Sequence, residues 1–147
     1  MPLKEQLLED MKSAMKSKDK ERLSVIRMLR AAVLNEEKNK TRELDEDEVI
    51  DVLAREAKKR KEAIPEYEKA QREDHVEKLK REIDIIMEYL PQQLTEQEIE
   101  EIVRQTIQEL GANSMKDMGK VMGKLMPQLK GKADGRLVNK IVRQHLQ

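Results

Sequence analysis

Lysines and glycines alternate along one short segment near the C-terminus, in a pattern suited to contact with a polyanion. Lys116, Lys120 and Lys124 recur every fourth residue, which places three ammonium groups on one side of a helix. Gly119 and Gly123 lie one position before the last two of these lysines. The row of ammonium groups therefore runs beside a strip without side chains. Such a strip suits close approach of either a neighbouring helix or a sugar-phosphate backbone, and the sequence leaves both alternatives open.

A second basic group follows the turn at Gly131. Lys132, Arg136, Asn139 and Arg143 are separated by steps of three or four residues, which predicts one common face of a final helix. The segment from Gly131 to Arg136 resembles a phosphate-binding loop, but it lacks the residue order of a P-loop and the preceding strand. The remaining hypothesis is an anion-binding pole at the helix N-terminus, with Lys132 and Arg136 beside it. An ordinary inter-helix turn explains the glycines equally well.

Positive charge is concentrated in this region, although the chain as a whole is neutral. The 147 residues contain 30 Lys and Arg against 30 Asp and Glu, whereas residues 112–147 contain eight basic and two acidic side chains. Tyr67 and Tyr89 are the only aromatic residues, so the basic region offers nothing on which single-stranded bases could stack. This composition favours double-stranded or folded RNA, bound through its phosphates and its shape. We expect Lys120 and Lys124 to converge with Lys132 and Arg136 around the glycine turn.

Side chains that could carry out catalysis are few. Cysteine is absent, which excludes cysteine nucleophiles, thiolate metal sites and disulfides. None of the four serines lies in a nucleophile elbow or an S-x-x-K arrangement. His75 and His145 are far apart and lack metal-ligand spacing with any carboxylate. We therefore predict no catalytic residue, no metal site and no cofactor.

The apolar pattern predicts an all-α fold of about seven helices without strands. Pro65 predicts a kink or a break within the third helix, because proline cannot donate the backbone hydrogen bond. Met115, Met118, Met122 and Met126 form a stripe that we interpret as core filler. The predicted helices span about 3–16, 23–38, 45 onward, 76–90, 95–110, 114–127 and from the turn at 131–135 to 146.

Pro91 and the two glutamines after it mark a boundary between two predicted domains. The first, residues 1–93, is expected to be a helical bundle, and the second, residues 94–147, a small three-helix domain. The N-terminus carries charges every few residues, which does not fit a signal peptide, and no apolar run is long enough to span a bilayer. We expect a cytoplasmic protein without membrane contact.

Three segments closely resemble the GatB/YqeY family, the stand-alone proteins similar to the tail of the B subunit of glutamine-dependent aminoacyl-tRNA amidotransferase. They are VIRMLRAAVLNE at 25–36, EYLPQQL at 88–94 and SMKDMGKVMGKLMPQLKGKADGRLVNKIV at 114–142. In the amidotransferase this tail contacts the elbow of tRNA, and a related helical region occurs in some glutaminyl-tRNA synthetases. The residues matching the shared tail pattern are Gly119, Lys120, Gly123, Met126, Gly131, Lys132, Val138 and Asn139.

The resemblance implies a tRNA-binding accessory module linked to an amidotransferase or an aminoacyl-tRNA synthetase. The implied partner is tRNA, contacted by Lys116, Gly119, Lys120, Gly123, Lys124, Gly131, Lys132, Arg136, Asn139 and Arg143. Two alternatives stay open: a protein-interaction module without RNA, and a carbon–nitrogen ligase with glutamine as amido-nitrogen donor. The catalytic centres of the amidotransferase have no counterpart in this chain, so the ligase alternative rests on the family label.

Overall fold

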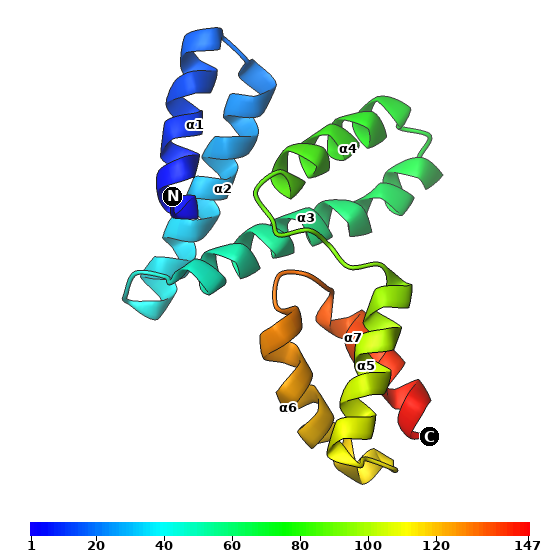
Figure 1. Ribbon diagram of the computed structural model, residues 1–147. Helices are drawn as coiled ribbons and strands as arrows, with labels where there is room; N and C mark the ends of the chain where they lie inside the picture. The colour runs from blue at the N-terminus through cyan, green and yellow to red at the C-terminus, as the bar shows by residue number, and fades with distance from the viewer. The chain divides into compact units, whose positions relative to one another are not determined.

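The computed structural model describes residues 1–147, and all its regular elements are helices (Figure 1). Seven α-helices and the short 3₁₀ turn η1 confirm the prediction of an all-α fold. Contacts group the chain into two units, Met1–Leu90 and Pro91–Gln147, and the predicted domain boundary after residue 93 stays a prediction. The elements are α1 (Leu3–Ser17), α2 (Lys20–Lys40), α3 (Glu46–Lys69), α4 (Glu73–Met87), α5 (Glu96–Leu110), η1 (Met115–Asp117), α6 (Met118–Leu129) and α7 (Gly135–Leu146).

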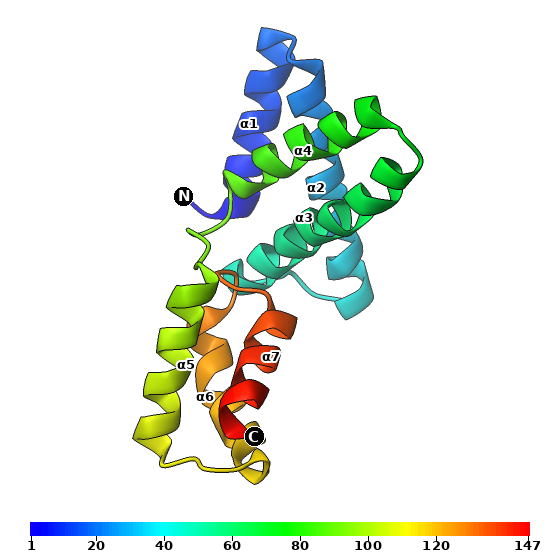
Figure 2. The ribbon, with the colours of Figure 1, turned by 90° about the vertical axis from the view of Figure 1, so that its right-hand side faces the viewer.

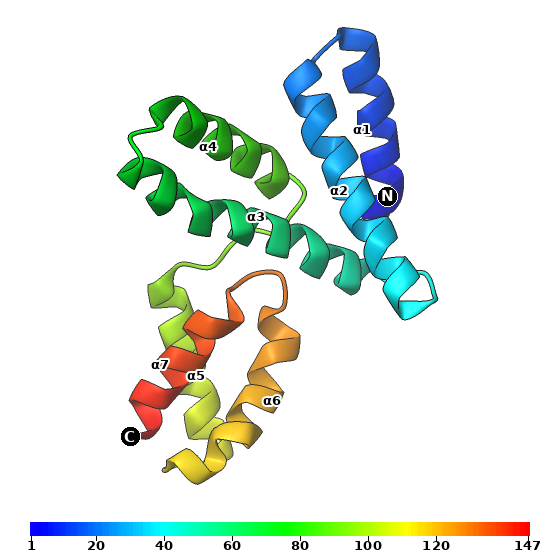
Figure 3. The ribbon, with the colours of Figure 1, turned by 180° about the vertical axis from the view of Figure 1, so that it is seen from behind.

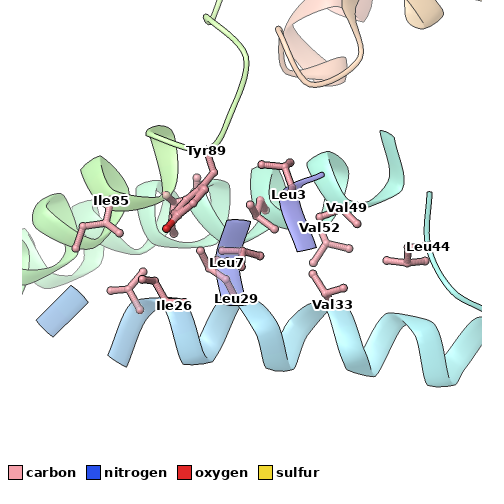
Figure 4. Packing of buried hydrophobic residues seen from close by; sticks show 14 residues of the cluster. Leu3, Leu7, Ile26, Leu29, Val33, Leu44, Val49, Val52, Ile85 and Tyr89 are labelled. Carbon is pink, nitrogen blue, oxygen red and sulfur yellow. The ribbon is translucent and has the colours of Figure 1, made fainter. Parts of the chain in front are cut away.

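The N-terminal unit consists of two helical hairpins, α1–α2 and α3–α4, that share one aliphatic core (Figure 1 and Figure 2). Leu7 from α1, Leu29 from α2 and Val52 from α3 meet in this core, with Tyr89 from the segment after α4 beside them (Figure 4). Side chains of this size bury apolar area in thin layers, because no Phe or Trp is present to span a wider gap.

Helix α2 is less buried than its apolar sequence predicts. Val25, Ile26, Leu29 and Val33 are buried on one side of it, as expected for a helix with a 3.6-residue period. Met28 and Leu34, in contrast, are 43% and 52% exposed. Helix α2 therefore lines the core with one face only, and its opposite face is open.

Helix α3 continues through Pro65 to Lys69, so the predicted break is absent. Pro65 is exposed and lies in the second-last turn of the helix. The carbonyl of Lys61, which loses its hydrogen-bond donor there, is close to the helix end and to solvent. Proline is tolerated better at such a position than in a helix interior, because water can satisfy the carbonyl that loses its donor.

Polar contacts tie the hairpins together at their edges. The Tyr89 hydroxyl donates to Asp10 Oδ2 at 2.6 Å, which joins the end of α4 to α1. Burial and the Asp10 carboxylate raise the pKa of Tyr89, so this phenol remains a donor across the physiological range. Arg60 is buried and lies 3.2 Å from Glu82 Oε1, joining α3 to α4. Removal of Glu82 would leave the Arg60 charge buried without a partner, so this pair fixes the register of α3 against α4. The Tyr89–Asp10 bond holds the second hairpin against α1.

The C-terminal unit packs α5, α6 and α7 around a second aliphatic core (Figure 2 and Figure 3). Thr95 caps α5 by accepting from the Glu98 amide, and Gly111 ends it at φ +64°, so both predicted ends are confirmed. The predicted methionine stripe only borders this core. Met115 is 40% exposed, which makes its assignment as core filler wrong. The buried residues are Ile99, Val103, Val121, Leu125, Leu129, Val138, Ile141, Val142 and Leu146.

The connection between α2 and α3 is organised by the carboxylate of Glu48. Asp45 and Glu48 form a reciprocal capping box at the start of α3. Arg42 donates to both oxygens of Glu48 at 2.8 Å, and Lys40 Nζ lies 2.7 Å from Oε2. Hydrogen bonds from Arg42 and then Lys40 hold the pKa of Glu48 well below its usual value. The connection should therefore depend on the ionised form of this side chain.

We predict that Glu48→Gln lowers stability at neutral pH and that its effect fades in acid. A carboxyl whose folded pKa is depressed stabilises the fold above its unfolded pKa, about 4.3, and loses that contribution as the pH falls. Urea denaturation between about pH 6 and about pH 3 should show the two curves approaching each other. Glu66→Gln, at an exposed position of α3 without a side-chain partner, is the matched control. A wild-type advantage that stays constant down to about pH 3 would contradict this role.

Candidate nucleic-acid interface

Helix α6 buries one narrow stripe and turns its opposite side outward. Ser114 accepts from the Lys116 amide and opens η1, which leads into α6. Val121, Leu125 and Leu129 follow at four-residue steps and are buried against α5 and α7. A stripe with this spacing occupies about one third of a helix circumference. The rest of α6 is available for contacts outside the chain.

The outward side of α6 is lined by Gly119 and Gly123. Both glycines are exposed, and a Cβ atom added at either position would meet no atom within 4 Å. No helix of the C-terminal unit therefore packs on them, which removes α5 and α7 as the neighbouring helix that the sequence left open. Neither glycine has a positive φ, so their backbone conformation does not require glycine.

The predicted lysines do not all lie on one helix, because Lys116 is in η1 whereas Lys120 and Lys124 are on α6. Lys116 and Lys120 are exposed and form no ion pair. Lys124 Nζ lies 2.9 Å from Glu109 Oε2, which ties it to the end of α5. Lys124 can thus reach an external phosphate only by leaving this exposed pair, and such a pair contributes little to stability. Lys116 and Lys120 are the two cations of the row that are directly available.

Gly131 belongs to a turn that is held from within the unit. Its φ is +76°, a conformation that favours glycine. The Gln93 side-chain amide donates to Gly131 O at 2.6 Å and to Pro91 O at 2.9 Å. The Leu94 amide donates to Lys132 O at 2.9 Å. These bonds join the start of α5 to the turn between α6 and α7. They explain why residues 88–94 and 114–142, far apart in the sequence, both belong to the family pattern.

Two expectations about the start of α7 are wrong. Helix α7 begins at Gly135, so Lys132 lies in the preceding turn and not on the helical face with Arg136. The N-terminal pole of α7 also carries a carboxylate already, because Asp134 accepts from the Arg136 amide at 3.0 Å. An additional anion at this pole would meet the negative charge of Asp134. The pole is therefore a capped helix end.

The four residues expected to converge around the turn lie in separate places. Lys120 is in the first turn of α6, whereas Lys132 follows the end of that helix. The nine residue steps from Lys120 to Leu129 alone span about 14 Å along the helix axis at 1.5 Å per step. The basic side chains thus form an α6 group and a group at the turn and on α7.

The outward face of α7 carries one basic residue that the sequence reasoning missed. Arg136 and Arg143 are exposed on it, and Asn139 is half-buried at its edge. Lys140 is also exposed, four residues after Arg136 and three before Arg143. The helical period places it on this face, and that spacing was the signal that could have found it. Val138, Ile141 and Val142 are buried on the opposite side.

A hollow of about 410 Å³ in the N-terminal unit and one of about 360 Å³ in the C-terminal unit interrupt the surface. The second lies between α5 and α6, and the predicted Lys132 is at its edge. Sequence reasoning could not find it, since its walls are two helices that meet only in the folded unit. Its lining residues are Leu94, Ile102, Gln105, Thr106, Glu109, Gln128, Leu129 and Lys132.

The structure also bears on metal sites, on the two histidines and on membrane spans. No group of three or more His, Cys, Asp or Glu side chains has the geometry to hold a metal ion. His145 Nε2 lies 3.3 Å from Glu100 Oε1, and the His75 ring packs against Tyr67 at 4.0 Å between centroids, so both histidines have structural neighbours. None of the helices has the length and apolar character needed to cross a membrane.

The fold and its outward basic helices define an all-α protein whose C-terminal unit has a glycine-lined helical face. Comparison with protein families gives this class a more specific identity. The family model described as Yqey-like protein matches residues 4–146, and the chain belongs to this family. The resemblance found in the sequence is thereby confirmed over nearly the whole chain.

Two fungal relatives share part of their length with this chain. A protein of Pyrenophora tritici-repentis named altered inheritance of mitochondria protein 41, mitochondrial, is 31% identical over 103 residues, covering 69% of this chain and 57% of the relative. Its namesake in Kluyveromyces lactis is 40% identical over 84 residues, covering 56% of this chain and 45% of the relative. The chain thus spans about half the length of these curated relatives.

Gly119→Ala and Gly123→Ala should each raise the free energy of unfolding by roughly 0.5–1 kcal/mol, because alanine restricts the unfolded chain and meets no neighbour in α6. Urea denaturation followed by circular dichroism measures this change. Gly111→Ala is the matched control, since φ +64° at that position should make the same change destabilising. Destabilisation at Gly119 or Gly123 would show that another part of the chain covers them.

Gln93→Ala should lower the free energy of unfolding of the C-terminal unit by about 1–2 kcal/mol, because two carbonyls lose their shared donor. Thermal melting followed by circular dichroism would show an earlier transition. Gln128→Ala, at an exposed position of α6, provides the comparison. An unchanged melt in Gln93→Ala would mean that water replaces the side-chain amide without loss.

Proposed function

We propose that the C-terminal unit binds folded RNA, in particular tRNA, through phosphate contacts along the outward side of α6. The observation that carries this proposal is the open glycine strip beside Lys116 and Lys120. Two exposed glycines within one helix lower its stability by roughly 1 kcal/mol each relative to alanine. Packing does not offset this loss of stability, because no residue of the C-terminal unit packs on the two glycines. A ligand backbone that must approach α6 closely would explain both glycines.

The chemistry around the strip supports RNA as the ligand. Lysines spaced by four residues present ammonium groups on one side of the strip, where each can neutralise a phosphate. The C-terminal unit contains no aromatic residue, so stacking on splayed bases cannot contribute. Recognition through shape and phosphate position is the mode expected for helical RNA. Arg136, Lys140 and Arg143 on α7 offer a second line of cations for a ligand as large as tRNA.

The protein would then act as an accessory of a tRNA-dependent amidotransferase or an aminoacyl-tRNA synthetase. This step rests on the resemblance of residues 114–142 to the amidotransferase tail. We place the protein in the cytoplasm as part of the same proposal. The fungal relatives carry a mitochondrial name, and mitochondria also require charged tRNA, so the proposed role fits either compartment. Catalysis as a carbon–nitrogen ligase is not proposed for the isolated chain, because no observation of this structure favours it.

A second candidate function is binding of a partner protein at the same strip. Met118, Met122 and Met126 are half-buried and border the glycines on the side away from the lysines. Methionine side chains adapt to many surfaces and are common at sites that bind helices. A partner helix packed on the glycines and methionines would bind with weak dependence on salt, whereas RNA binding would weaken strongly as salt rises.

Reversal of four cations to Glu, at Lys116, Lys120, Lys132 and Arg136, should abolish binding to total tRNA without loss of helicity. Each phosphate contact changes the slope of log affinity against log salt by somewhat less than one, so four contacts would give a slope near −3. Filter binding or fluorescence anisotropy at several salt concentrations would measure both quantities.

The control carries the same number of reversals in the N-terminal unit, at the exposed lysines Lys16, Lys18, Lys61 and Lys78. It should keep the affinity within a few-fold if binding is local to the C-terminal unit. Equal loss in both variants would indicate a net-charge effect. Wild-type protein without tRNA affinity at low salt would overturn the RNA proposal and favour the partner-protein alternative.

A further inference from the structure

The outward face of α2 forms a shallow apolar trough with a basic rim, which we call the α2 trough. Two neighbouring hollows of about 410 and 440 Å³ lie along this helix, and Arg27 and Ala31 line both of them. Leu23 and Met28 belong to one hollow and Leu34 to the other. The two hollows thus adjoin at the small side chain of Ala31. Figure 3 shows α2 and its neighbour α1 from the side opposite to that of Figure 1.

The exposure of this apolar surface is unusual for the chain. Met28 and Leu34 are two of only five large hydrophobic residues that are exposed. They lie on the same helix, and the remaining exposed residues of that face are small or basic apart from the amide of Asn35. A contiguous apolar patch with a polar rim marks an interaction surface more often than scattered exposed residues do. Neither side chain belongs to the buried core, where Val25, Leu29 and Val33 fill the inner face, although the Met28 sulfur accepts from Arg60 of α3 at 3.7 Å.

The rim of the α2 trough is positive because each carboxylate of α2 is paired with a cation of another helix; Glu37 and its partner Lys4 both line one of the hollows. Glu21 binds Arg81 of α4 at 2.8 Å, and Glu37 binds Lys4 of α1 at 2.7 Å. Glu36 pairs with Arg55 of α3 at 3.9 Å. All three acidic side chains of the helix thus serve contacts within the unit, so none is left to balance the cations on the outward face.

The cations of the rim have no carboxylate partner in the fold. Arg27, Lys20 and Lys38 form neither a side-chain hydrogen bond nor an ion pair, and Arg30 donates only to the sulfur of Met11 at 3.2 Å. Steps of three and four residues bring these four side chains to the same side of α2 as Ala31 and Leu34. Other arginines of the unit, such as Arg22 and Arg81, are paired with glutamates of neighbouring helices. The rim of the α2 trough therefore gathers several cations without a carboxylate partner on one face of a single helix.

We infer that the α2 trough docks an acidic amphipathic helix of a partner protein. The distance from Lys20 to Lys38 is about 27 Å at 1.5 Å per residue, which suits about five turns of a bound helix. A leucine stripe on that helix would lie on Leu34, Ala31 and Leu23, and acidic residues beside the stripe would face the rim. The apolar floor argues against RNA, which offers no apolar side chains to cover it. The concave shape argues against a flat bilayer surface.

This inference goes beyond the RNA proposal and is independent of it. The α2 trough lies in residues 1–90 and the glycine strip in residues 91–147, so separate substitutions test each surface in the full-length protein. A protein that lost RNA binding through its C-terminal variants would retain helix docking. The two outcomes are therefore measured on different variants with different ligands.

The test is an NMR titration of the ¹⁵N-labelled full-length protein with a designed peptide of about five helical turns, which carries a leucine stripe flanked by glutamates. Amide shifts should concentrate in residues 20–38, with the affinity falling as salt rises. A control peptide of the same composition, with its leucines spread around the helix, should bind at least tenfold more weakly because it presents no stripe. Shifts that are absent, or that concentrate outside α2, would overturn the inference.

Two variants identify the surface. Lys20→Glu with Arg27→Glu should weaken peptide binding by tenfold or more, whereas the charge-matched control, Lys61→Glu with Lys78→Glu, should leave it nearly unchanged. Ala31→Gln should also weaken binding by filling the junction of the two hollows, and it keeps a good helix former at an exposed position. Equal affinities for all variants would overturn the inference even if the peptide binds.

Three further measurements test whether another ligand occupies the α2 trough. Displacement of the peptide by total tRNA, with the same shifts in α2, would assign the trough to RNA. Binding to vesicles containing phosphatidylserine that is lost in Lys20→Glu with Arg27→Glu would assign it to a membrane surface. Dimerisation in sedimentation equilibrium that is lost in the same variant would assign it to a second copy of this chain. Each of these results would overturn docking of a partner helix, and their absence together with stripe-specific peptide binding supports it.

Discussion

Burial of a single aliphatic stripe on each helix is the constraint from which the other features of this protein follow. Without Phe or Trp, the two cores are filled by Leu, Ile and Val, whose layers are thin. A helix that buries only one third of its circumference leaves the rest to solvent. On α6 that remainder carries the glycine strip, and on α2 it carries the trough. The two surfaces that could receive ligands are thus consequences of how little of each helix the core requires.

Charged side chains supply the positional precision that an aliphatic core lacks. Glu37 accepts from the Leu44 amide and pairs with Lys4, and Glu46 accepts from the Leu3 amide, so carboxylates hold the α2–α3 connection against the start of α1. Exposed pairs of this kind contribute little free energy each. Their effect is to fix which helix ends meet. On α2 all three glutamates are used in such contacts, and cations of its outward face remain without a carboxylate partner.

The residues of the family pattern divide into two physical groups. Gly131 needs its positive φ, Lys132 is held through its carbonyl, and Val138 is buried, so the fold itself accounts for these three. Met126 packs beside Gly135, where a Cβ atom would lie 3.5 Å from its terminal methyl group. Gly119, Lys120 and Gly123 face outward, and no internal contact requires them. Only this second group calls for a ligand.

Capping residues and the 3.6-residue period are local signals, so the helical fold and most helix ends could be predicted from the sequence, as could the segment that we propose as a binding surface. Thr95, Gly111 and the Val138–Val142 stripe were readable in this way. Four other properties depend on the packing of the helices against one another. Whether a helix covers Gly119, whether Asp134 closes the pole of α7, how far Lys120 lies from the turn and which face of α2 is open all depend on which helices become neighbours. Spacing along the chain does not contain that information, since packing joins residues that are distant in sequence.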